Sequence, residues 1–383
     1  MSHASVQDKV KLRLWVAAGG RCEYPGCNKA LYRDDLTLAD MNRSNVAHII
    51  ADKPGGPRGD EILSPQLAGE FSNLMLMCYD HHHLIDHEGL DEHPVEVLCT
   101  MKAEHERRIE TVTGIDHERK TEILIYTAKV GHHNPRISYP EAATAVLTNG
   151  HYPASYHPLE LGRSNSLVTD TEDRFWADEE EHLRSVMQQR LLPRLENGSI
   201  QDLSVFARAP QPLLTLLGYL LCDINHRVRV YQLHREPPGW SWQDYPAGFE
   251  YVVEEPDGAK RRPALVFALS ATVTNDRVFA ALGDDAAIWR ITIPEPHNDF
   301  LKSARQLRQF RELIRQMLDK IKARHGQGTP LCVFPAAPVA IAVELGRVLQ
   351  PKADMPLRLY DQNNDRGGFV HALDINLADR GTP

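Results

Sequence analysis

The chain has 383 residues, 42% of them hydrophobic, which is enough for two or three domains with buried cores. It carries 43 Lys and Arg against 52 Asp and Glu, so it lacks the overall basic surface of a simple nucleic-acid-binding protein. The sequence shows no secretion signal and no long apolar run, which argues against a membrane partner and predicts a cytoplasmic location with reduced cysteines.

Four zinc-type ligands occur as two short-range pairs within the first 115 residues. A turn-forming Pro25-Gly26 lies inside the first pair, and the second pair follows an apolar run over residues 74–77 that predicts a short strand. Three cysteines and one histidine satisfy the tetrahedral preference of zinc, and such a metal can stabilise a segment too small for a large core. The predicted ligands of a structural Zn2+ are Cys22, Cys27, Cys78 and His81.

Further polar residues lie between and beside these ligands. His48 can take a proton from water near neutral pH, and Asn73 can hold a loop or orient His48 through its amide. His82 can bind a catalytic cation, Mg2+ or another divalent ion, through one imidazole nitrogen. One helix is expected over residues 5–19 and another begins at His82. Between them, the segment that carries the metal ligands is predicted to run strand, turn, strand and then into the second helix.

The order of His48, Asn73 and His82, with Asn73 nine residues before His82 and Cys78 between them, resembles the HNH endonuclease family over about residues 15–110. The resemblance implies an α+β domain of the ββα-metal fold, in which His48 is the general base, Asn73 is structural and His82 binds the metal. Many members have Asp immediately before the first His as a second metal ligand, and here that position is Ala47. The candidates for the second ligand are Asp86, Asp52 and His83.

The first domain, residues 1–115, is itself acidic, with 12 Lys and Arg against 18 Asp and Glu. Contact with double-stranded DNA would therefore need bound cations, a groove between subunits or a local basic patch. The residues available for such a patch are Arg13, Arg21, Lys53 and Arg58. His87, His93 and His105 are expected to be ordinary surface histidines.

Beyond the metal-ligand region, residues 95–111 predict an amphipathic helix that closes the first domain. Residues 116–174 are assigned to a connector that contains a strand over 121–130 and a short helix over 141–147. From about residue 175 to residue 383, strands and helices alternate, which predicts an α/β domain with parallel sheets of Rossmann type. The expected strands cover 203–206, 228–233, 265–269, 287–293, 331–334 and 357–360, and the expected helices cover 179–195, 212–222, 276–282, 299–325 and 339–349.

An internal repeat is visible in this second half. Leu203–Pro210 matches Leu331–Pro338, and Gly218 matches Gly346 at the same offset of 128 residues. Two such units are expected to form a cleft at the carboxyl ends of their strands, where α/β sheets bind ligands. Small residues before a helix N-terminus suit a phosphate, although the prolines could simply start helices, and the tryptophans at 240 and 242 could stack a base or belong to the core. The predicted ligand contacts are Ala209, Pro210, Gln232, Trp242, Ser270, Thr272, Ala337, Pro338 and Asp361.

The Phe-Ala-x-Ala-Pro segment at 206–210, the Gly-centred helix, the Val-Tyr-Gln strand and the Trp-x-Trp at 240–242 resemble the SAVED domain over about residues 175–380. That resemblance implies two fused CARF-like Rossmann units that bind a cyclic di- or oligonucleotide. An HNH domain followed by a SAVED-like domain resembles the HNH–SAVED effectors of CBASS antiphage defence. The combination implies a cyclic-nucleotide-activated endonuclease that cuts double-stranded DNA and works as a homo-oligomer.

Two other interpretations stay open. The first unit could be a non-catalytic, zinc-containing module that binds nucleic acid as a regulator, with the α/β half as its ligand sensor. Alternatively, the α/β half could be the enzyme and cleave its own cyclic nucleotide.

Overall fold

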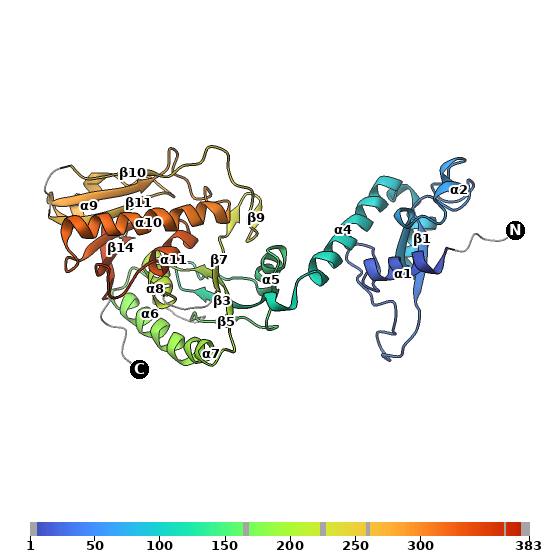
Figure 1. Cartoon of the computed structure of the whole chain (residues 1–383), viewed down its shortest axis with the longest axis horizontal. Helices are drawn as coiled ribbons and strands as arrows, with labels where there is room; N and C mark the ends of the chain where they lie inside the picture. Colours follow the sequence, from blue (N-terminus) through green and yellow to red (C-terminus); the bar gives the residue numbers. More distant parts are fainter. Residues whose placement is uncertain (1–5, 164–167, 223–226, 258–260, 364, 377–383) are drawn as a thin grey trace. The chain divides into compact units, whose positions relative to one another are not determined.

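The computed structural model describes residues 6–163, 168–222, 227–257, 261–363 and 365–376, and the outer limits predicted for the two domains, residues 1 and 383, lie outside these ranges. The chain divides into two compact units, residues 1–116 and 117–383 (Figure 1). The boundary falls one residue after the end predicted for the first domain. Among the described residues, none of the helices is both long and apolar enough to cross a membrane.

The first unit is built around two antiparallel strands, β1 (Ser44–His48) and β2 (Leu74–Cys78), with His48 opposite Leu74. All five residues of β2 are buried, because its apolar side chains pack on both faces. A helix, α3 (Tyr79–His83), follows β2 directly and continues as one turn of π-helix, η2 (Leu84–Glu88). The expected strand and helix are therefore present, although the helix begins at Tyr79. The other elements of this unit are α1 (Asp8–Ala17), α2 (Leu63–Leu67), η1 (Phe71–Asn73), η3 (Leu90–Glu92) and α4 (Val95–Thr113).

The second unit contains two large sheets. The first is parallel and has five strands, and the second has six strands in the order β10-β12-β11-β13-β14-β15. In the second sheet β10 and β15 run antiparallel to their neighbours, so the prediction of purely parallel sheets is wrong there. The strands of the first sheet are β3 (Lys120–Thr127), β4 (Tyr152–Pro153), β5 (Leu159–Glu160), β6 (Asp202–Arg208) and β7 (Arg227–Val230). Those of the second are β10 (Val252–Glu254), β11 (Arg262–Ala268), β12 (Ala286–Thr292), β13 (Leu331–Ala336), β14 (Leu357–Asn363) and β15 (Gly368–Ile375), and β8 (His234–Arg235) pairs separately with β9 (Pro238–Gly239).

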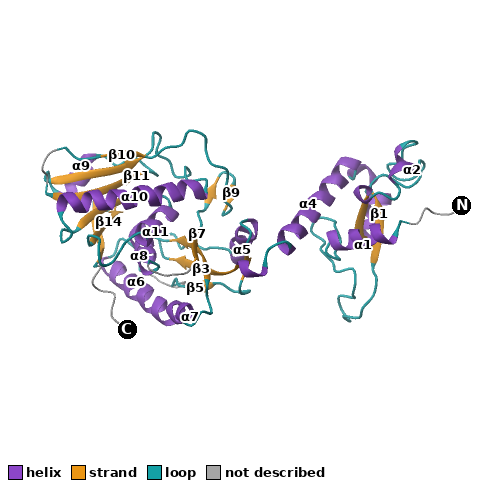
Figure 2. Ribbon diagram, in the orientation of Figure 1, coloured by secondary structure: helices purple, strands orange, loops and turns teal. Residues whose placement is uncertain are grey.

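Helices of the second unit separate the sheets and cover their outer faces (Figure 2). One core contains the inner faces of both sheets together with α6 (Asp173–Val186), η5 (Met187–Leu191), α7 (Leu192–Glu196), α8 (Gln211–Leu220), α10 (Ala304–His325) and α11 (Val339–Arg347). Two smaller cores lie on the outer faces, under α5 (Tyr139–Thr148) and α9 (Asn275–Leu282). A short helix, η4 (His117–Arg119), precedes β3. The α10 helix begins later than predicted, because Ser303 and Gln306 form a capping box there.

The internal repeat is longer than the sequence predicts. In the first half β3 pairs in parallel with β6 and β6 with β7, just as β11 pairs with β13 and β13 with β14 in the second half. Residues 116–174 therefore supply the first strand and helix of the first half, and the assignment of a connector to this segment is wrong. The predicted strand over 121–130 followed by a helix over 141–147 already matches the strand–helix order of a repeat unit.

Candidate functional site

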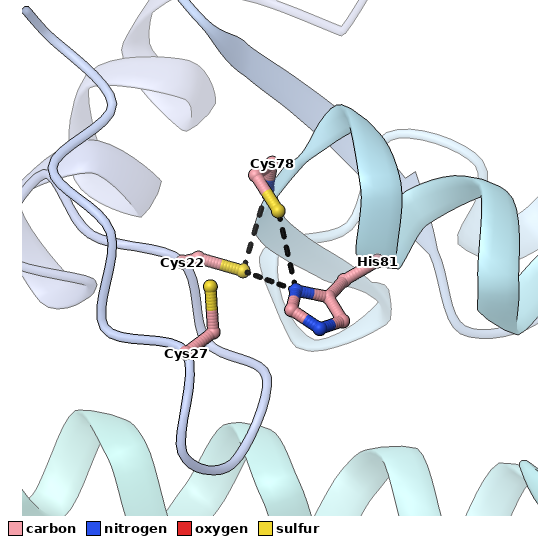
Figure 3. A group of neighbouring side chains, drawn as sticks. All are labelled: Cys22, Cys27, Cys78 and His81. Atoms are coloured by element: carbon pink, nitrogen blue, oxygen red, sulfur yellow. Dashed lines mark hydrogen bonds between the residues drawn. The ribbon is translucent and has the colours of Figure 1, made fainter. Parts of the chain in front are cut away.

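Four ligand-type side chains of the first unit converge on one point (Figure 3). The Sγ atoms of Cys78 and Cys22 lie 3.2 Å and 3.7 Å from Nδ1 of His81, and these three atoms and the Sγ of Cys27 all lie within 4.8 Å of one another. Tetrahedral ligands at about 2.0–2.3 Å from zinc are separated by roughly 3.3–3.8 Å. The cluster therefore fits a zinc ion at the four positions that the sequence predicts.

Burial controls the protonation of two side chains in this cluster. Burial raises the pKa of the Cys22 thiol to about 12, so a cation would be needed to favour its thiolate form. Burial, and then the charge of Lys29, lowers the pKa of His81, which keeps its imidazole neutral and able to bind a metal. The ring of His81 also stacks on Tyr24, with 4.1 Å between the ring centroids, and this contact fixes its orientation.

The chain segments that carry His48 and Asn73 lie side by side where β1 ends. Nε2 of His48 lies 3.0 Å from the carbonyl oxygen of Ala68. A carbonyl only accepts, so Nε2 carries the proton and Nδ1 of the neutral ring keeps a lone pair. The buried Asn73 side chain accepts from the N–H of Ile50 and donates to its C=O, at 2.8 Å each. Asn73 therefore holds the loop that follows His48, which is one of the two roles considered for it.

His82 and Asp86 lie one helical turn apart on the same face. Nε2 of His82 is 3.2 Å from Oδ2 of Asp86, and Oδ1 of Asp86 accepts from Nη2 of Arg58 at 2.6 Å. Burial alone would raise the pKa of the Asp86 carboxyl, but hydrogen bonds from His82 and Arg58 outweigh it and hold the pKa below its usual value. Of the candidate second cation ligands, Asp86 thus lies against His82, whereas His83 faces Glu88 at 3.8 Å.

Two histidines that were expected at the surface are buried. Nδ1 of His93 donates to the carbonyl of Gly89 at 2.6 Å, and its Nε2 lies 3.1 Å from the hydroxyl oxygen of Tyr24. Nε2 of His105 bonds the carbonyl oxygen of Ala18 at 3.0 Å. Both tie together segments distant in sequence, which a single-sequence pattern does not reveal. His87 is exposed, as expected.

Two glutamines of the first half of the second unit bind the N-terminus of α11. The N–H groups of Ala337 and Ala340 donate to Oε1 of Gln211 and Gln232, at 3.1 Å each. In α8 the residue that matches Ala340 is Pro212, which has no N–H. Two amides near the start of α11 are therefore already bonded, and the position in α8 that matches one of them has no N–H. The residues Ala209, Pro210, Ala337 and Pro338 are all buried, which favours the simpler interpretation that the prolines start helices.

The remaining predicted ligand contacts are more accessible. Trp242, Ser270 and Asp361 are half-buried and Thr272 is exposed. The N–H of Ser270 donates to the carbonyl oxygen of Ala336 at 2.8 Å, so the carboxyl ends of β11 and β13 lie together. This is the edge at which a ligand is expected in an α/β sheet.

Three other side chains considered for the ligand, Asp361, Trp240 and Trp242, differ in character. Burial, and then the charge of Asp170, raises the pKa of Asp361 to about 7. Trp240 is buried against Phe206, with 5.2 Å between the ring centroids, and is a core residue. Trp242 is half-buried, and its ring meets His234 edge-on at 5.7 Å between centroids.

Residues 183–375 match the SAVED family, described as a "SMODS-associated and fused to various effectors sensor domain". The similar solved structures include the Acinetobacter baumannii Cap4 SAVED/CARF-domain containing receptor with the cyclic trinucleotide 3'3'3'-cAAA, at 12% identity and a TM-score of 0.43, covering 75% of this chain and 60% of that one. The Moraxella osloensis Cap4 SAVED/CARF-domain containing receptor is 10% identical with a TM-score of 0.38, covering 83% of this chain and 70% of that one. No curated protein matches the chain.

The present chain thus spans 60% of the length of the Acinetobacter receptor. The family match covers slightly more than half of the 383 residues and confirms the resemblance to SAVED that the second half showed. On this match, the chain belongs to the SAVED family of sensor domains.

Proposed function

We propose that the chain is a DNA endonuclease that a cyclic di- or oligonucleotide activates by binding to its SAVED domain, and that it acts in antiphage defence of the CBASS type. The first unit would cut the DNA, and the second unit would bind the cyclic nucleotide. The observation that carries the proposal is the arrangement of His48, Asn73, His82 and Asp86 beside a zinc-type cluster, in a chain whose other half is a SAVED domain.

In this proposal His48 is the general base. Its Nε2–H bond to the carbonyl of Ala68 fixes the ring and the tautomer, so that Nδ1 can take a proton from the attacking water. Asn73 keeps the loop after His48 in place through its two bonds to Ile50. The cysteine–histidine cluster is structural, because all four of its ligand positions come from protein side chains.

His82 and Asp86 are the proposed ligands of the catalytic cation. Two ligands about 2.1 Å from Mg2+ in neighbouring octahedral positions are roughly 3.0 Å apart. The 3.2 Å between Nε2 of His82 and Oδ2 of Asp86 is close to that separation. A divalent ion there would supply positive charge to the phosphate and the leaving oxygen. Asp86 would then take the place of the ligand that Ala47 does not provide.

Activation requires that the cyclic nucleotide bind the active state more tightly than the inactive one. We propose that the active state is a homo-oligomer in which first units come together on double-stranded DNA. The acidic balance of residues 1–115 supports this, since a groove between subunits or bound cations can offset the repulsion from phosphates.

The proposal is tested by plasmid cleavage with Mg2+, with and without a panel of cyclic di- and trinucleotides. Cleavage is expected only with an active member of the panel. His48→Ala should lower the rate by about 100-fold or more, because a general base contributes about that much, and the exposed His87→Ala is the matched control. DNA binding without cleavage under all conditions would instead favour the non-catalytic regulator.

A further inference from the structure

We propose that Arg58 is a positioning residue for the cation site formed by His82 and Asp86. The proposal rests on the function proposed above and adds to it a residue that would act by holding a ligand of the cation. Arg58 is assigned this role because a single guanidinium connects the strand end that carries His48 with the helix that carries the two cation ligands.

The contacts of Arg58 span both halves of the proposed site. Its side chain is 7% exposed. Nε donates to the carbonyl of Ile49 at 2.7 Å, and Nη2 lies 3.3 Å from the carbonyl oxygen of His48. On the helical side, Nη1 donates to the carbonyl of Ile85 at 2.6 Å and Nη2 to Oδ1 of Asp86 at 2.6 Å.

The backbone on both sides of Arg58 is tightly packed. Arg58 has a φ of 54°, in the left-handed region that residues other than glycine rarely adopt. A Cβ at Gly56 would lie 2.5 Å from Cβ of Ala51, and a Cβ at Gly59 would lie 2.4 Å from the carbonyl oxygen of Pro54. Such a conformation persists only where the surrounding structure enforces it, and strained residues of this kind cluster at functional sites.

The hydrogen bond from Arg58 to Asp86 indicates that Arg58 positions a cation ligand and does not merely join the loop to the helix. The bonds to carbonyl groups would be sufficient to join the loop to the helix. The additional bond holds one carboxylate oxygen of Asp86, so the plane of the carboxylate is fixed and the other oxygen stays directed at Nε2 of His82. Partners of metal ligands commonly orient them in this way, and losing such a partner typically costs about 10- to 100-fold in metal affinity or activity.

Arg58→Lys tests geometry separately from charge. Lysine keeps the positive charge, but its donors sit on one nitrogen and cannot reach the carbonyls and the carboxylate together. The matched control is Arg43→Lys, because Arg43 also pairs with an aspartate of the same unit, Asp34 at 3.1 Å, on an exposed surface.

The experiment uses the full chain loaded with zinc. Mn2+ binding is followed by the loss of the free-ion electron paramagnetic resonance signal, and plasmid cleavage is measured against Mg2+ concentration in the presence of the activator. Arg58→Lys should raise both the Kd for Mn2+ and the half-saturating Mg2+ concentration by about 10- to 100-fold, with zinc content and melting temperature close to those of the parent. In an Asp86→Asn background the same substitution should have little further effect, because both residues act through one carboxylate.

A folded Arg58→Lys variant with the Mn2+ affinity and Mg2+ requirement of the parent would overturn the proposal. If Arg58→Lys loses zinc or has a lower melting temperature than the parent, the Asp86→Glu variant is measured in its place. Asp86→Glu displaces the carboxylate and leaves the bonds from Arg58 to the carbonyl groups in place. Unchanged Mn2+ affinity in that folded variant would also overturn the proposal. A parent chain that binds Mn2+ through Asp86 but never cuts DNA would remove the proposed function alone.

Discussion

Gly218 of α8 and Gly346 of α11 meet where the two helices cross. A Cβ at Gly218 would lie 1.9 Å from the carbonyl oxygen of Val343, and a Cβ at Gly346 would lie 2.0 Å from the carbonyl oxygen of Thr215. Thr215 and Val343 are separated by the same 128 residues as the two glycines. The contact therefore has a pseudo-twofold symmetry, and it joins the two halves of the second unit backbone to backbone.

Gly218→Ala and Gly346→Ala should each destabilise the second unit. The added methyl group would overlap a backbone carbonyl, which can be relieved only by separating α8 from α11, and we expect a loss of about 3 kcal/mol or more. Unfolding in urea, followed by tryptophan fluorescence, measures the change. Gly328→Ala is the control, because a Cβ there meets nothing within 4 Å. Equal stability of the three variants would show that the helices do not touch at this crossing.

Loss of the proposed zinc site should unfold the first unit. Cys22→Ala or Cys78→Ala is expected to abolish zinc binding and expose residues 1–116 to proteolysis, because metal binding at such a site supplies folding free energy. Elemental analysis and limited proteolysis measure both effects. Cys99→Ala is the control, since Cys99 is an exposed free thiol. A soluble, zinc-free Cys22→Ala chain as stable as the parent would show that the cluster is not structural.

Asp86→Asn should weaken the proposed catalytic cation site without disturbing the fold. Asparagine keeps an oxygen for Arg58 but removes the negative charge beside His82. We expect the half-saturating Mg2+ concentration for DNA cleavage to rise by about tenfold or more. The exposed Asp91→Asn serves as the control. If Asp86→Asn needs the same Mg2+ concentration as the parent, Asp86 is not the second cation ligand, and Asp52, His83 or a water molecule would be the remaining candidates.

Local patterns in the sequence predicted most helices and strands and the residues that meet at the zinc-type cluster. Residues at i and i+4 of a helix share a face, so Asp86 could be named as a partner for His82. Short buried strands reveal the repeat in the sequence, but the polar stretch that follows β3 hides the fact that this strand belongs to it. The bonds from Gln211 and Gln232 to α11 were not predictable, since they join residues 126 and 108 positions apart.

Asp361 should make the second unit less stable as the pH rises. Its folded-state pKa of about 7 lies above the unfolded value near 3.8, so the folded state binds this proton more tightly. The stabilising contribution of the protonated carboxyl is full below pH 4 and is lost toward pH 7, at no more than about 1.4 kcal/mol per pH unit. Asp361→Asn should remove that dependence, whereas the exposed Asp284→Asn should keep it. Urea unfolding between pH 4 and pH 7 measures the difference.

The ligand should contact Trp242 and Thr272 rather than the N-terminus of α11. Residues close to them in the chain bond to one segment, residues 297–302, since Gln243 N–H donates to the carbonyl of Lys302 at 2.9 Å and His297 N–H donates to that of Leu269 at 3.0 Å. Stacking of a base on an aromatic ring is worth about 1–3 kcal/mol, so Trp242→Leu should weaken binding roughly 5- to 150-fold.

Calorimetry with the activating cyclic nucleotide decides between the two locations. Thr272→Ala should weaken binding by several-fold, because a hydrogen bond contributes about 0.5–1.5 kcal/mol. Gln211→Ala exposes the amide of Ala337 and should leave the affinity within about twofold, because the ligand does not use that amide. A gain of up to about tenfold in Gln211→Ala, with no loss in Trp242→Leu, would mean that a phosphate competes with Gln211 for the helix end. The phosphate site first predicted from the small residues before Pro338 would then be correct, and the two glutamines would be the side chains that the activator displaces.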